Sequence, residues 1–150
     1  MGATRAFVIH PDIQGTTARD PAAALAEGVA LAHALPGLEV VGEQVVRLRD
    51  ARPSTLFGKG KLAELGAMFE GSEVDLVLID GPVTPVQQRN LERDWKVKLL
   101  DRTGLILEIF SDRARTREGV LQVEMAALSY QRTRLVRAWT HLERQRGGGL

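Results

Sequence analysis

The sequence contains no cysteine, which excludes disulfide bonds, thiolate metal sites and cysteine nucleophiles together. It also lacks any apolar run near the roughly 20 residues that a membrane-spanning helix requires. The opening residues lead into a short expected strand rather than into the apolar core of a signal peptide. These absences predict a cytoplasmic protein with no membrane span.

Charge is unevenly distributed along the 150 residues, although the formal net charge is only +1. Residues 1–100 hold 11 Lys and Arg against 13 Asp and Glu, whereas residues 101–150 hold 9 against 6. All nine of the later cations are arginine, and the planar guanidinium group matches two phosphate oxygens at once. This distribution hints at contacts with phosphate or RNA in the last third of the chain.

Apolar runs alternate with helical patterns through the first hundred residues. Strands are expected at 5–10, 39–48, 74–80 and 97–101, the first ended by Pro11. Helices are expected at 21–35, 62–71 and 85–95. Thr84 and Gln87 form a capping-box pattern at the start of the last of these. The alternation predicts an α/β fold with a small, mostly parallel four-stranded sheet and flanking helices.

Beyond Gly104 the strand patterns stop, and a long amphipathic helix is expected. Its apolar stripe has heptad-like spacing and consists of Leu121, Met125, Leu128, Leu135, Trp139 and Leu142. One helix cannot cover its own apolar stripe, so this stripe needs the α/β domain, a second helix or a partner chain. The expected division is an α/β subdomain at 1–104 and a long-helix subdomain at 105–150.

A glycine- and lysine-rich segment precedes the second expected helix. It is no P-loop, because Thr55 and Leu62 stand where a Walker A motif needs a glycine and a Ser or Thr. Backbone amides and lysines at a helix N-terminus nevertheless attract phosphate. The candidate phosphate-binding residues are therefore Gly58, Lys59, Gly60 and Lys61, and a simple turn with solvated lysines is the alternative.

Two aspartates, Asp80 and Asp101, follow the third and fourth expected strands. The carboxyl edge of a parallel sheet is where ligands bind, and such a pair could hold Mg²⁺ or act as acid and base. The favoured interpretation is that they start turns and cap helices. The three histidines are scattered without metal-ligand spacing, so neither an active site nor a metal site is expected.

Polar side chains crowd the helix at 85–95, where Gln87, Gln88, Arg89 and Asn90 follow one another. These groups can hydrogen-bond phosphate, ribose or a protein surface. Gln87 and Asn90 are three residues apart and can share one helical face. Exposed polar helix surface is the more common explanation.

Arg113, Arg115 and Arg117 occupy alternate positions directly behind the apolar run 105–110. In a helix Arg113 and Arg117 share a face and Arg115 points away, whereas in an extended segment all three share a face. From Arg113 to Arg146 there are eight arginines and three glutamates. This net charge suits an RNA backbone, and a solvated helix face is the alternative.

Several long motifs in order resemble the amino-terminal region of the HflX family of ribosome-associated GTPases. They cover most of the chain from about Pro53 onward. The residues that carry the resemblance are Thr55 with 58–61 and 64–65, then 85–92, 101–110 and 113–124, and finally Leu135, 139–142, 144–145 and the glycine run. Residues 1–50 add little.

The resemblance implies a GTPase that binds the large ribosomal subunit and its RNA and helps to split or recycle stalled ribosomes. It also implies an α/β subdomain followed by two long antiparallel helices joined by a glycine-rich loop. Leu150 would lie in that loop, and the return helix and the P-loop, with the residues for GTP and Mg²⁺, would lie beyond it. No GTP hydrolysis and no cofactor are therefore expected of this chain. Without the return helix, either a homodimer through the uncovered stripe or fraying of the helix end is expected.

The arginines are divided between two expected roles. The candidates for binding RNA are Arg134, Arg137, Arg144, Arg146, Arg113 and Arg117, whereas Arg115, Asp101 and Arg102 are expected to brace the domain junction. Two other functions stay open. One is an independent nucleotide-binding domain with phosphate at residues 58–61, and the other is a regulatory or oligomerisation domain.

Overall fold

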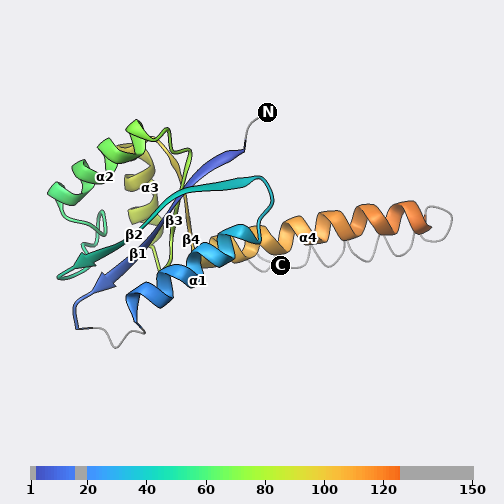
Figure 1. Cartoon of the computed structure of the whole chain (residues 1–150), viewed down its shortest axis with the longest axis horizontal. Helices are drawn as coiled ribbons and strands as arrows, with labels where there is room; N and C mark the ends of the chain where they lie inside the picture. The colour runs from blue at the N-terminus through green and yellow to red at the C-terminus, as the bar shows by residue number, and fades with distance from the viewer. Residues whose placement is uncertain (1–2, 16–19, 126–150) are drawn as a thin grey trace. The chain divides into compact units, whose positions relative to one another are not determined.

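The structure of the chain, a computed structural model, describes residues 3–15 and 20–125 (Figure 1). The elements are β1 Thr4–Ile13, α1 Pro21–His33, β2 Leu38–Leu48, α2 Lys59–Gly71, β3 Leu76–Ile79, α3 Pro85–Trp95, β4 Lys98–Asp101 and α4 Arg102–Met125. The strands form one sheet in the order β2-β1-β3-β4, and each neighbouring pair is parallel. The predicted α/β fold class is confirmed.

Helices cover both faces of this sheet (Figure 1). Side chains of β1 alternate between the faces, so Phe7 and Ile9 pack with α2 and α3, whereas Ala6 and Val8 pack with α1 and the first turns of α4. β3 is buried on both faces, as its continuous apolar sequence predicts. Two apolar clusters therefore form the core, one on each side of the sheet.

The first strand is longer than expected, because β1 continues through Pro11 to Ile13. Pro11 pairs with Val46 of β2, whereas the pairing of β1 with β3 ends at Ile9. Pro11 thus lies where β1 has a neighbouring strand on one side, the kind of position to which proline is confined in sheets. The prediction that Pro11 ends the strand was wrong.

The third helix follows its sequence closely. The hydroxyl of Thr84 accepts a hydrogen bond from the backbone N–H of Gln87 at 3.1 Å, and the side chain of Gln87 accepts one from the backbone N–H of Thr84 at 2.9 Å. This reciprocal pair is the predicted capping box. It fixes the start of α3 at Pro85.

The chain packs as two compact units, Met1–Phe110 and Ser111–Leu150. The expected subdomain boundary at Gly104 lies in the first turn of α4, which begins at Arg102 directly after β4. Leu121 and Met125 of the apolar stripe lie in α4, whereas the later stripe residues lie outside the described part of the chain. Among the helices of residues 3–15 and 20–125, none is long and apolar enough to cross a membrane.

Candidate functional site

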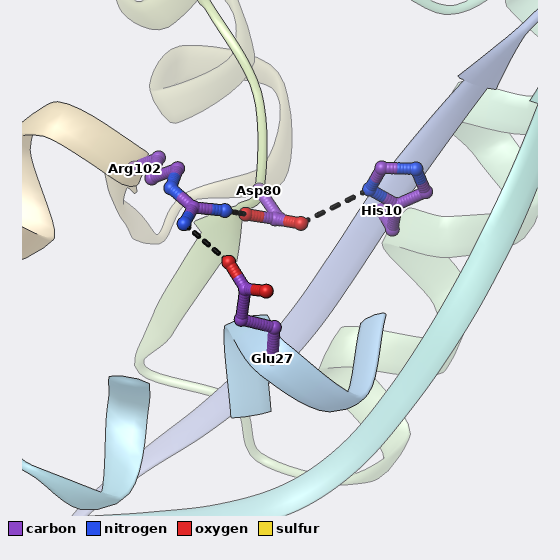
Figure 2. A network of polar contacts seen from close by, with 4 residues as sticks. All are labelled: His10, Glu27, Asp80 and Arg102. Atoms are coloured by element: carbon purple, nitrogen blue, oxygen red, sulfur yellow. Dashed lines mark hydrogen bonds and ion pairs between the residues drawn. The ribbon is translucent and has the colours of Figure 1, made fainter. Parts of the chain in front are cut away.

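Four charged or titratable side chains meet at the carboxyl edge of the sheet, on the face covered by α1 and α4 (Figure 2). Asp80 follows β3, and its carboxylate accepts hydrogen bonds from Nη1 of Arg102 at 2.9 Å and from Nδ1 of His10 at 3.1 Å. The other guanidinium nitrogen of Arg102 donates to Oε1 of Glu27 in α1. One network thus joins β1, β3, α1 and the first residue of α4.

The network occupies the position where open parallel sheets of this kind bind ligands. β1 and β3 are neighbours in the sheet although β2 lies between them in the sequence, so the chain connections leave in opposite directions at their carboxyl ends. Here that crevice is filled, because the remaining cavity beside Gly28, Asp80 and Arg102 has a volume of only about 10 Å³. This is close to the smallest space that holds one water molecule.

The network contains two carboxylates, one guanidinium group and the imidazole ring of His10. The side chain of Asp80 is 4% exposed, so its carboxylate depends on Arg102 and His10 for compensation. The pKa of Arg102 is raised, chiefly by the hydrogen bond to Glu27 and further by Asp80, while burial opposes the rise. Because a carboxylate only accepts hydrogen bonds, Nδ1 of His10 carries the proton, and its buried Nε2 has no partner among the described residues.

This arrangement binds side chains to one another rather than presenting free groups for catalysis. Asp80 is held by a cation, and Oδ1 of Asp101 accepts a hydrogen bond from the backbone N–H of Gly104 at 2.7 Å. Asp101 thus caps the first turn of α4. Across the described residues, no group of three or more His, Cys, Asp or Glu side chains is placed to hold a metal ion.

The candidate phosphate segment lies at the start of α2. Gly58 is the N-cap, the cap has no side-chain hydrogen bond, and the first turn has no acidic residue. Lys61 is paired with Glu64 at 2.8 Å, whereas Lys59 and Gly60 are exposed. Phosphate binding by these residues stays a prediction.

The polar residues of α3 hold neighbouring backbone instead of facing solvent alone. Gln87 donates to the carbonyl of Arg52 at 2.7 Å, and Asn90 donates to the carbonyl of Ser54 at 2.8 Å. Gln88 donates to the carbonyl of Leu99 in β4 at 3.0 Å. Sequence reasoning recognised their hydrogen-bonding capacity but missed these partners, which fix the loop before α2 and the edge strand of the sheet.

The first arginine cluster is helical and exposed. Arg113, Arg115 and Arg117 all lie on α4, so their helical arrangement is settled. Arg115 is 67% exposed and lies 3.4 Å from Asp112 of the same helix. Its bracing role stays a prediction, and the four distal candidates, Arg134, Arg137, Arg144 and Arg146, lie outside the described residues.

Comparison with known proteins places these features in a family. Residues 22–111 match the family described as GTP-binding GTPase N-terminal, and residues 113–150 match the GTP-binding GTPase middle region. The chain is 57% identical to the GTPase HflX of Magnetococcus marinus over 112 residues, which are 75% of this chain and 26% of that protein. It is 52% identical to the GTPase HflX of Escherichia coli over 96 residues, 64% of this chain and 22% of that protein.

A solved structure shares the fold. The crystal structure of SsGBP in complex with GDP aligns with a TM-score of 0.50 and 22% identity, over 85% of this chain and 35% of that one. The chain therefore spans about a quarter of the length of the curated relatives it matches. It belongs to the HflX family of GTPases, whose amino-terminal and middle regions it matches.

Proposed function

We propose that this chain is the ribosome-contacting region of an HflX-like GTPase and that its arginines bind RNA of the large ribosomal subunit. The observation that carries the proposal is the exposure of Arg113, Arg115 and Arg117 on α4, where Arg113 and Arg117 share one face of the helix. Arg115 lies near Asp112 at 3.4 Å, an exposed pair that contributes little in water. The cluster thus keeps most of its positive charge for a partner.

Phosphate is the partner that this chemistry fits best. A guanidinium group can donate two parallel hydrogen bonds to phosphate oxygens and stays charged at every physiological pH. Arg113 and Arg117 share one face of α4 and can therefore contact neighbouring phosphates of an extended anionic backbone.

The catalytic activity belongs to a different part of the full-length protein under this proposal. The relatives are named as GTPases, and the matched segment covers about a quarter of their length. GTP and Mg²⁺ would bind in a separate GTPase domain, and the region described here would direct that domain to the ribosome. Splitting or recycling of stalled ribosomes is the activity that this assembly would perform.

Co-sedimentation with purified large ribosomal subunits tests the proposal. The intact chain should pellet with the subunits at low salt and less at moderate salt, because phosphate contacts release counterions. A variant with Arg113→Glu and Arg117→Glu should lose binding, whereas Arg93→Glu, an exposed arginine of α3, should retain it. Binding that is the same at both salt concentrations and is unaffected by Arg113→Glu with Arg117→Glu would contradict the proposal.

A further inference from the structure

We infer that Arg102 is a latch that holds the first turns of α4 on the α/β domain, and that these turns release as a unit, with the sheet intact, when the latch is opened. The first turns are residues Arg102–Phe110, which belong to the same compact unit as the sheet. The inference concerns this unit alone. It holds whether or not the arginines of α4 bind RNA.

The latch has two arms of different character (Figure 2). One nitrogen of the guanidinium donates to Asp80, whose side chain is almost wholly buried, and the other donates to Glu27, whose side chain is 43% exposed. The buried arm is hard to break, because an unpaired carboxylate would remain inside the protein. The exposed arm is screened by salt and water. The forked guanidinium group presents separate nitrogens to the two carboxylates, Nη1 to Asp80 and Nη2 to Glu27.

The apolar contacts of these turns are confined to one narrow face of the helix. Leu105 and Ile109 are buried against the sheet and α1, whereas Leu107 and Phe110 on the other side of the helix are 59% and 62% exposed. The first turns are thus attached by a narrow face of two buried side chains and one charged residue. Segments with few buried contacts open at lower free energy than the core.

The sheet has its own support when these turns leave. The apolar cluster on the opposite face comprises residues of all four strands, α2, α3 and the loop before α2, and it contains no residue of α4. Asp80 also keeps its hydrogen bond to His10. Loss of the latch should therefore free α4 before it unfolds β1 or β3.

Gly28 shows how closely the latch is fitted to α1. A β-carbon built on Gly28 would lie 3.3 Å from both Cβ and Cγ of Asp80. The absence of a side chain brings α1 near enough for Glu27 and Asp80 to reach the same guanidinium group. The two carboxylates are positioned by helix packing and not by the flexibility of the arginine alone.

Amide hydrogen exchange measured by mass spectrometry tests the inference. In Arg102→Met, amides of residues 106–110 should exchange at least about tenfold faster, while those of β1 and β3 change by less than about twofold. Glu27→Gln removes the negative charge of the exposed arm and leaves the contact with Asp80 in place, so it should accelerate the same helical amides by a smaller factor and leave the sheet unchanged. Arg113→Met, an exposed arginine farther along α4, should leave the first turns at the wild-type rate.

Three results would overturn the inference. Equal acceleration of helix and sheet in Arg102→Met would mean that Arg102 supports the whole domain and is no latch. Unchanged exchange at residues 106–110 would mean that Leu105 and Ile109 hold the helix without it. Failure of the variant to fold would show that the sheet cannot persist without this side chain.

Discussion

Gly42 of β2 lies so close to the ring of Phe7 in β1 that a β-carbon built on the glycine would be 2.4 Å from Cε2. The strand register shifts at this point, since Ala6 pairs with Val40 and Phe7 with Gly42. Phe7 is buried and meets Phe69 of α2 edge to face, with ring centroids 5.2 Å apart. The register shift thus places the ring of Phe7 against the backbone of Gly42, where there is no side chain.

Gly42→Ala should therefore destabilise the protein by about 1–3 kcal/mol, because the methyl group forces Phe7 out of a packed core. Urea denaturation followed by circular dichroism measures the change. Gly60→Ala is the matched control, since a β-carbon there meets no atom within 4 Å and Gly60 lies in the first turn of α2. Equal stability of both variants would show that Phe7 can move aside freely.

Gln87→Ala should cost about 1–3 kcal/mol of unfolding free energy, because the carbonyl of Arg52 and the N–H of Thr84 each lose a partner. The loop before α2 should also become a preferred site of limited proteolysis. Arg89→Ala serves as control, since Arg89 is exposed on the same helix. If the two variants unfold at the same urea concentration, the side chain of Gln87 does not hold the loop.

The sequence predicts most of the fold because its signals are local. Thr84, Pro85 and Gln87 set the start of α3 within a few residues of chain, and β3 is visible as an unbroken apolar run. The sequence predicts that β1 ends at Pro11, and this prediction is wrong. Proline is excluded from a strand that has a paired strand on each side, but it is tolerated where one side of the strand is unpaired. Whether β1 has one neighbour or two at that residue depends on the strand order, which no local pattern contains.

The charged network could be foreseen only in part. Asp80 and Asp101 are candidates from the sequence because they follow strands, yet Asp80 binds Arg102 and His10, whereas Asp101 accepts a hydrogen bond from the backbone of Gly104. His10 and Asp80 are 70 residues apart in the chain. They become neighbours in space because β3 lies beside β1 in the sheet. The sequence shows that polar residues stand at the ends of buried strands, which indicates a polar cluster at that edge of the sheet. Which residues pair with one another depends on the strand order, which the sequence does not show directly.

The isolated chain is expected to dimerise through the stripe of Leu121, Met125, Leu128, Leu135, Trp139 and Leu142, because an apolar stripe of this length is unfavourable in water. Sedimentation equilibrium should show a concentration-dependent dimer. Leu128→Glu with Leu135→Glu should shift it to monomer. A wild-type chain that stays monomeric at all concentrations, with its helix protected from exchange, would contradict this prediction.

The salt dependence of ribosome binding should report the number of arginine contacts. Each arginine that binds a phosphate contributes about 0.7–0.9 to the slope of log affinity against log salt concentration. Arg113→Gln and Arg117→Gln should each lower the slope by about that amount and weaken binding. Fluorescence anisotropy of the labelled chain with large subunits measures it. An unchanged slope would assign the affinity to other groups.

The absence of cysteine allows the most direct measurement. Ala114→Cys lies between Arg113 and Arg115 on α4, and Ala67→Cys lies on the exposed side of α2, so each variant carries one unique thiol. An iron chelate attached to that thiol generates hydroxyl radicals that cut nearby RNA. The account predicts discrete cuts in large-subunit ribosomal RNA from position 114, suppressed by Arg113→Glu and Arg117→Glu, and weaker or different cuts from position 67. Identical cutting from both positions, or none from position 114 while the chain is bound, would contradict it.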